Sequence, residues 1–164
     1  MSREKIVIVS GYFDPLHIGH LEYFRLAKEL GDKLVVIVNN DKQCELKKGE
    51  SFMNERDRLE IVFELGMVDE VFLSCDEDSS VCKSIEKVIQ FHEESYPGGV
   101  TMPYDFVFCN GGDRHLEEIP ETKICNELEV DMVDGLGEKI RSSSELTGIK
   151  AMSRLHETEY YNND

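Results

Sequence analysis

The stretch from Ser10 to His20, with the sequence SGYFDPLHIGH, constrains the fold of this chain more than any other. It follows a short apolar run over Ile6–Val9 and leads into a segment with helical periodicity, so we expect it where a buried strand ends and a helix begins. Ligands bind at this edge of an open α/β sheet. His17 and His20 would face the same way on a first helical turn, where the helix N-terminus favours an anion. The stretch therefore predicts phosphate chemistry.

Short β-branched apolar runs alternate with longer amphipathic segments along most of the chain. We expect strands over residues 6–10, 34–39, 68–73, 104–109 and 130–133. We expect helices over residues 18–30, 54–65, 79–95, 117–128 and 142–155. This alternation predicts one three-layer α/β domain over residues 1–155 with a five-stranded parallel sheet, followed by a polar tail over 156–164. Right-handed crossovers would place every strand-to-helix loop along one edge of that sheet.

Several local features of the helices can also be predicted. Gly31 stands where the C-cap of the first helix would be. Asn54 can cap the helix that follows it, and the polar segment before it, 40–53, reads as a lysine-containing loop. Phe63 and Phe91 belong to the apolar positions that we expect to face the core.

The charge balance excludes some classes of partner. The chain has 18 basic and 34 acidic residues, a net charge of −16, which argues against nucleic acid or an anionic membrane as partner. A phosphate-binding protein of this charge must gather its cations locally. The segment 139–154 is basic and follows an acidic one, so it is either the phosphate side of a site or an ordinary mixed helix surface.

The sequence also suggests a compartment. No apolar run approaches the about 18 residues of a membrane span, and no secretory signal opens the chain, so we expect a cytoplasmic protein. The five cysteines are scattered and lack the spacing of metal ligands, which favours plain structural thiols in a reducing compartment. No metal ligand is assigned.

Gly11-Tyr12-Phe13-Asp14 followed by His17-Ile18-Gly19-His20 fits the Gly-x-Phe-Asp-x-x-His-x-Gly-His signature of cytidylyltransferase-like nucleotidyltransferases at every defined position. The chain resembles this family over most of its length, which implies a Rossmann-like fold of the HxGH type. It looks most similar to glycerol-3-phosphate cytidylyltransferases and heptose-1-phosphate adenylyltransferases. The segments that carry this closer resemblance are Asn39–Asp41, Lys47–Gly49, Arg58, Gly111–Asp113 and Ser142–Ser144.

The resemblance implies a reaction. A phosphorylated sugar or polyol attacks the α-phosphate of CTP or ATP, and pyrophosphate leaves. Because the attacking phosphate is already a nucleophile, the site must mainly neutralise developing negative charge. The resemblance implies Mg²⁺ or another divalent cation with the triphosphate, and relatives of this size are commonly homodimers.

The resemblance also assigns roles to residues. The catalytic residues would be His17, His20 and Lys47. The nucleotide-binding residues would be Gly11, Tyr12, Phe13, Asp14, Gly19, Gly112, Asp113, Arg141, Ser142, Ser143 and Ser144. Asp14 would orient the histidines or a magnesium-bound water. Lys48 would contact the acceptor substrate, and Arg58 would bind the acceptor's phosphate.

Some alternatives stay open at this point. Arg141 directly abuts Ser142, so either Lys139 or Arg141 can take the place of a family arginine. The segment Glu93–Pro103 is longer than in the most similar families and is either a lid, an acceptor pocket or a surface insertion. The chain could instead adenylylate a cofactor precursor, or be a non-catalytic nucleotide-binding regulatory protein, which the intact histidine pair disfavours. Class I aminoacyl-tRNA synthetases share the His-Ile-Gly-His tetrapeptide, but the chain lacks their length and basic surface.

Overall fold

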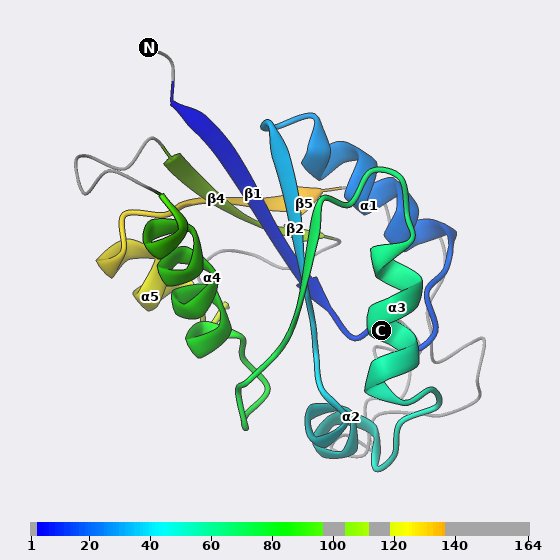
Figure 1. Ribbon diagram of the computed structural model, residues 1–164. Coiled ribbons are helices and arrows are strands. Elements are labelled where there is room, and N and C mark those ends of the chain that lie inside the picture. The colour runs from blue at the N-terminus through cyan, green and yellow to red at the C-terminus, as the bar shows by residue number, and fades with distance from the viewer. Residues whose placement is uncertain (1–2, 97–103, 112–118, 137–164) are drawn as a thin grey trace.

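Five strands form one parallel sheet in the computed structural model, which describes residues 3–96, 104–111 and 119–136 (Figure 1). The strands are β1 (Glu4–Gly11), β2 (Lys33–Val38), β3 (Glu70–Leu73), β4 (Tyr104–Gly111) and β5 (Asp131–Leu136). Their order across the sheet is β3-β2-β1-β4-β5, and every neighbouring pair is parallel. The predicted Rossmann-like α/β fold with a five-stranded parallel sheet is confirmed.

Helices cover both faces of the sheet. On one face lie α1 (Ile18–Lys28) and α3 (Glu55–Phe63), and on the other α4 (Cys82–Ser95) and α5 (Thr122–Glu127). A further helix, α2 (Asp41–Lys48), lies beyond the carboxyl end of β2 (Figure 1). The helix expected over 142–155 and the tail over 156–164 lie outside the described residues.

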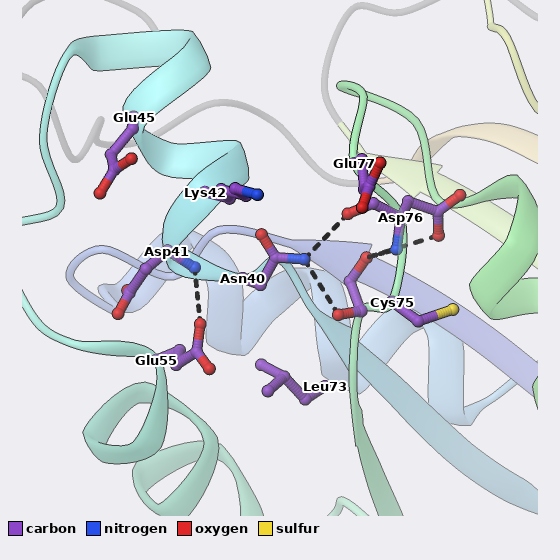
Figure 2. A pocket seen from close by; sticks show the side chains of 10 residues that line it. Asn40, Asp41, Lys42, Glu45, Glu55, Leu73, Cys75, Asp76 and Glu77 are labelled. Atoms are coloured by element: carbon purple, nitrogen blue, oxygen red, sulfur yellow. Dashed lines mark hydrogen bonds between the residues drawn. The ribbon is translucent and has the colours of Figure 1, made fainter.

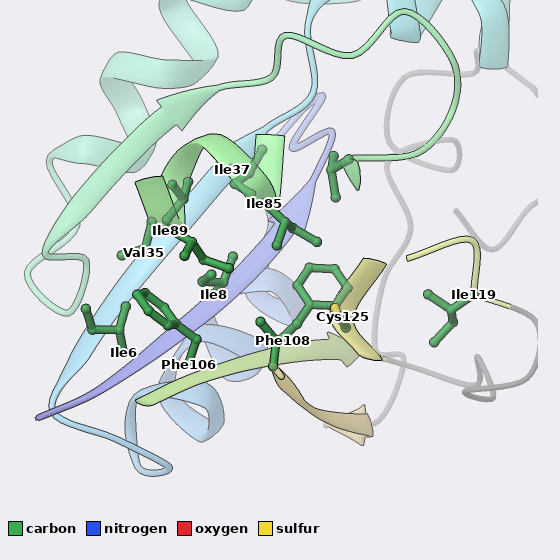
Figure 3. Packing of buried hydrophobic residues seen from close by; sticks show 13 residues of the cluster. Ile6, Ile8, Val35, Ile37, Ile85, Ile89, Phe106, Phe108, Ile119 and Cys125 are labelled. Atoms are coloured by element: carbon green, nitrogen blue, oxygen red, sulfur yellow. The ribbon is translucent and has the colours of Figure 1, made fainter. Parts of the chain in front are cut away.

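The central strands are buried on both faces, as their uninterrupted apolar sequence predicts. Ile6 and Ile8 of β1 pack toward α4 and α5 in the cluster of Figure 3, whereas Val7 and Val9 pack toward α1 and α3. All four side chains are fully buried. Burying one such side chain contributes about 1.5–3 kcal/mol, so this strand anchors the loop that follows it.

The segment 40–53 differs from its prediction as a loop, because it contains α2. Asn40 caps this helix in a capping box: its side chain accepts from the backbone N–H of Gln43 at 2.9 Å, and Gln43 Oε1 accepts from the N–H of Asn40 at 3.0 Å. Gly49 ends the helix with a left-handed φ of 88°. The sequence signals for this helix are the cap pattern Asn-x-x-Gln and the terminal glycine. Its sequence is too polar to show the apolar stripe by which helices are usually recognised.

Two aromatic residues also differ from their predicted burial. Phe63 is 54% exposed and Phe91 is 49% exposed. On α4 the inward position next to Phe91 belongs to His92, whose Nδ1 lies 2.8 Å from the carbonyl oxygen of Val88 and whose Nε2 lies 2.9 Å from Glu70 Oε2. His92 follows Val88 by one helical turn, so the buried stripe continues through a polar residue that a search for apolar residues overlooks.

Gly31 is required by close packing rather than by a helix cap. The C-cap of α1 is Glu29, in right-handed conformation. A Cβ at Gly31 would lie 2.7 Å from Val7 Cγ2 and 2.8 Å from the carbonyl oxygen of Lys5, whereas a Cβ at Gly66 would meet nothing within 4 Å. We therefore expect Gly31→Ala to lower the free energy of unfolding by about 1–3 kcal/mol in urea denaturation, and Gly66→Ala to change it little. Equal effects of the two substitutions would contradict this packing.

No helix within residues 3–96, 104–111 or 119–136 is both long and apolar enough to cross a membrane.

Candidate active site

The candidate site lies where the direction of strand succession reverses. From β1 the chain builds β2 and β3 on one side, then returns to add β4 and β5 on the other, so the carboxyl ends of β1 and β4 flank a topological switch point. Gly11 ends β1 and Gly111 ends β4, two residues beyond the paired Val9 and Cys109. The strand ends from which two of the three predicted loops start therefore share one edge of the sheet. The third, with residues 141–144, lies outside the described residues, as do Gly112 and Asp113.

The two histidines of the motif lie against each other at the start of α1. Their rings are stacked, with centroids 3.8 Å apart and planes at 23°. His17 is the N-cap of the helix, and its Nδ1 accepts a hydrogen bond from the N–H of Gly19 at 3.1 Å. His20 Nδ1 accepts from the N–H of His17 at 3.2 Å. The prediction that both imidazoles face the same way is confirmed.

These hydrogen bonds fix the tautomer of both rings. A nitrogen that accepts from a backbone N–H carries no proton, so in each neutral imidazole the proton sits on Nε2. His17 and His20 thus each have a donor at Nε2, beside the N-terminus of an α-helix. Donors of this kind can neutralise charge on phosphate oxygens without transferring a proton.

The ring of Phe13 packs against His20, and Gly11 leaves the space that this ring occupies. Phe13 is buried with a left-handed φ of 51°, and its ring makes edge contacts with His20 and with Phe24, at centroid distances of 5.0 and 5.2 Å. A Cβ at Gly11 would lie 2.7 Å from the Phe13 ring. Gly11 is therefore the residue that lets this aromatic side chain pack under His20.

Two lysines stand at the C-terminal end of α2, and one of them contacts a residue of the motif. Lys47 Nζ lies 4.4 Å from the centroid of the Tyr12 ring, in the loop that precedes the histidines. Lys48 is buried, and its Nζ has no hydrogen-bond partner among the described residues. A buried ammonium without a partner is costly, so its position fits an anionic ligand.

The carboxylate of Asp14 binds backbone N–H groups of a neighbouring loop. It was predicted to orient the histidines or a magnesium-bound water. Its carboxylate is fully buried and accepts from the backbone N–H groups of Phe52 and Met53, at 2.8 and 2.6 Å. These contacts tie the loop before α1 to the loop between α2 and α3. In the described structure Asp14 thus positions these two loops, and its contact with the nucleotide stays a prediction.

Arg58, whose contact with the acceptor's phosphate stays a prediction, binds the protein's own backbone in the described structure. Its guanidinium is fully buried and donates to the carbonyl oxygens of Tyr12, Asn39 and Met53 at 2.6–2.8 Å. It also donates to Asp41 Oδ1 at 2.8 Å, and its Nε lies 3.9 Å from Asp14 Oδ1. The side chain that was expected at a ligand thus joins three segments around the site.

A cavity of about 510 Å³ lies beside this network, at the carboxyl ends of β2 and β3 (Figure 2). Its lining includes five carboxylates: Asp41, Glu45, Glu55, Asp76 and Glu77. Asn40 Nδ2 donates across it to the carbonyl oxygens of Ser74 and Asp76, at 3.0 and 2.9 Å. Carboxylates repel phosphates, so this cavity suits the triphosphate less well than the start of α1.

Three of the five cysteines are buried, in agreement with their reading as structural thiols. Burial raises the pKa of the Cys44 thiol to about 11 and the pKa of the Cys109 and Cys125 thiols to about 12. Cys75 is exposed at the acidic cavity. Within the described ranges, no group of three or more His, Cys, Asp or Glu side chains is placed to hold a metal ion.

Comparison with known proteins decides the family. The model of the family described as "Cytidylyltransferase-like" matches residues 8–146, which include both glycine loops and the histidine motif. The chain belongs to the cytidylyltransferase-like family. This match and the relatives below confirm the predicted enzyme class, nucleotidyltransferase.

Relatives within this family carry two kinds of name. A protein named FAD synthase from Thermococcus sibiricus is 40% identical over 105 residues, which are 63% of this chain and 68% of that protein. An FAD synthase from Thermoplasma acidophilum is 34% identical, over 69% of this chain and 74% of its own. The bifunctional protein HldE from Shewanella sediminis is 32% identical over 71% of this chain and 21% of its own. In several other FAD synthases the matched part is about half of the relative's length.

A solved structure has the same fold as this chain. The lipopolysaccharide core biosynthesis protein from Thermoplasma volcanium superposes with a TM-score of 0.60 at 25% identity, over 82% of this chain and 98% of its own. The names of the sequence relatives favour the cofactor-precursor alternative over a sugar- or polyol-phosphate acceptor.

Proposed function

We propose that this cytidylyltransferase-like protein transfers AMP from ATP to the phosphate of FMN, giving FAD and pyrophosphate. A phosphate oxygen of FMN forms a bond to the α-phosphorus as the bond to the pyrophosphate oxygen breaks. The observation that carries the proposal is the similarity to proteins named FAD synthase, at 34–40% identity over about two thirds of this chain. FMN carries a phosphate monoester, so it can serve as the nucleophile that the reaction needs.

The described residues have the chemistry for this reaction. The Nε2–H groups of His17 and His20 donate to phosphate oxygens whose charge grows in the transition state, and the N-terminus of α1 adds a partial positive charge. Lys47 and Lys48 supply cationic groups to the leaving pyrophosphate or the acceptor's phosphate. Mg²⁺ would come bound to the triphosphate and neutralise part of its charge.

The remaining predicted contacts belong to the proposal as well. Backbone N–H groups of Gly11, Tyr12 and Phe13 would face the triphosphate, and Gly19 would lie beside it at the start of α1. Gly112 and Asp113 would contact the nucleoside, and residues 141–144 would hold the β- and γ-phosphates. The homodimer and the cytoplasmic location also stay predictions.

A sugar phosphate is the second candidate acceptor. One relative is named bifunctional protein HldE, and a solved structure of the same fold is named a lipopolysaccharide core biosynthesis protein. The same site chemistry would serve this acceptor, because only the group attached to the attacking phosphate changes.

The test is a matrix of two nucleotides and several acceptors. The purified chain is incubated with Mg²⁺ and either ATP or CTP, together with FMN, heptose 1-phosphate or glycerol 3-phosphate, and pyrophosphate release is measured. We expect release with ATP and FMN, with FAD identified by chromatography. Release with a sugar or polyol phosphate but not with FMN would overturn the FMN proposal and establish the second candidate.

A further inference from the structure

The side chain of Asn110 has no evident structural purpose. This penultimate residue of β4 is only 7% exposed, and its Nδ2 is buried without a hydrogen-bond partner among the described residues. More than about 90% of buried polar groups in native proteins are hydrogen-bonded, and an unsatisfied one destabilises the fold. At the edge of a ligand crevice, a bound ligand can supply the partner that this amide lacks.

The strand register places Asn110 on a definite side of the sheet. Phe106 and Phe108 point toward α4 and α5, while Val107 and Cys109 point toward α1 and α3. A Cβ at Gly111 would lie 3.1 Å from Tyr23 of α1, so the alternation continues to the end of the strand. Asn110 therefore faces the side of α4 and α5. These two helices lie on the opposite face of the sheet from α1 (Figure 1).

Among the described residues, the groups that suit a phosphate and the amide of Asn110 belong to different parts of the site. The helix N-terminus and the histidines, on α1, suit the triphosphate. Across the switch point, on β4, stands a neutral buried amide, which suits a neutral acceptor atom. Ligands of open α/β sheets bind at this switch point, so a nucleotide with its phosphates at α1 can place its nucleoside at β4.

We propose that Asn110 binds the nucleoside part of the nucleotide, its Nδ2 donating to a ring nitrogen, carbonyl oxygen or hydroxyl of the base or ribose. The inference rests on the nucleotide binding in the proposed function, but not on the identity of the acceptor. It assigns a specificity residue to a position that neither the motif nor the comparisons single out.

The test compares nucleotides with a ligand that lacks the nucleoside. Affinities of Asn110→Leu and Asn110→Asp for ATP, CTP and inorganic tripolyphosphate are measured by calorimetry on the full chain. We expect about tenfold weaker binding of at least one nucleotide and unchanged binding of tripolyphosphate. Removing the buried amide should also keep or raise the melting temperature of the ligand-free Asn110→Leu protein. Asn126→Leu, at an exposed position of α5, is the matched control.

Nucleotide affinities equal to those of the wild type in both variants would overturn the inference, as would an equal loss of tripolyphosphate binding. Asn110→Asp preserves the shape of the side chain, so it decides the matter if the leucine variant fails to fold. A wild-type chain that binds ATP but forms no FAD would refute only the FMN proposal. A wild-type chain that binds neither nucleotide would refute both.

Discussion

Replacing Arg58 with methionine is expected to lower the free energy of unfolding by about 3–5 kcal/mol. The substitution removes the donors to three backbone carbonyl oxygens and to Asp41, and it leaves the fully buried Asp14 without its nearest cation. Buried acceptors that lose their partners retain the full cost of desolvation. Urea denaturation followed by circular dichroism measures the change.

Arg56→Met provides the matched control, because Arg56 lies two residues away on the same helix and is exposed. We expect it to change the stability by less than about 0.5 kcal/mol. Arg58→Lys should recover only a small part of the loss, since an ammonium cannot reproduce the planar fork of a guanidinium. If Arg58→Met were as stable as the control but bound the acceptor more weakly, the contact with the acceptor's phosphate would be correct after all.

Replacing His17 with asparagine is expected to reduce kcat by about 10²–10³-fold with little change in stability. Asparagine is among the best N-cap residues, so it can accept the hydrogen bond that His17 Nδ1 accepts from Gly19. It has no counterpart to the Nε2–H donor of the imidazole. The asparagine variant thus separates the chemical role of this residue from its role in starting α1.

His17→Ala is the companion variant, and it should lose both the activity and about 1 kcal/mol of stability from the missing cap. Steady-state kinetics with the acceptor that supports pyrophosphate release, and thermal unfolding of each variant, give the two readouts. An asparagine variant with wild-type kcat would show that the Nε2–H group of His17 does not take part in the chemistry.

The sheet could be predicted from the sequence because its strands are buried on both faces. Such strands appear as uninterrupted apolar runs, as in Ile6–Val9 and Leu34–Val38. The stacked histidines could also be predicted, because helical spacing alone places His17 and His20 on one face. The helix α2 could not be found in the same way, since its signals are a cap and a terminal glycine rather than an apolar stripe.

The backbone contacts of Asp14 and Arg58 could not be predicted from local sequence patterns. Both are charged residues beside a phosphate motif, and charged residues there are expected at the ligand. In the fold they are buried close to each other, and both contact Met53, with Asp14 accepting from its N–H and Arg58 donating to its carbonyl oxygen. Whether a charge meets a ligand or the protein's own backbone depends on tertiary contacts between distant segments, which spacing along the chain does not reveal.

The packing of Gly11, Phe13 and His20 bears on protein design. Engineers who graft a histidine pair onto another parallel sheet would transfer the donors but not the aromatic ring that fixes their orientation. That ring demands a residue without a Cβ two positions before it and a left-handed backbone at its own position. A usable module therefore runs from the last residue of the strand through the first turn of the helix, and the shortest transplant is set by sterics as much as by chemistry.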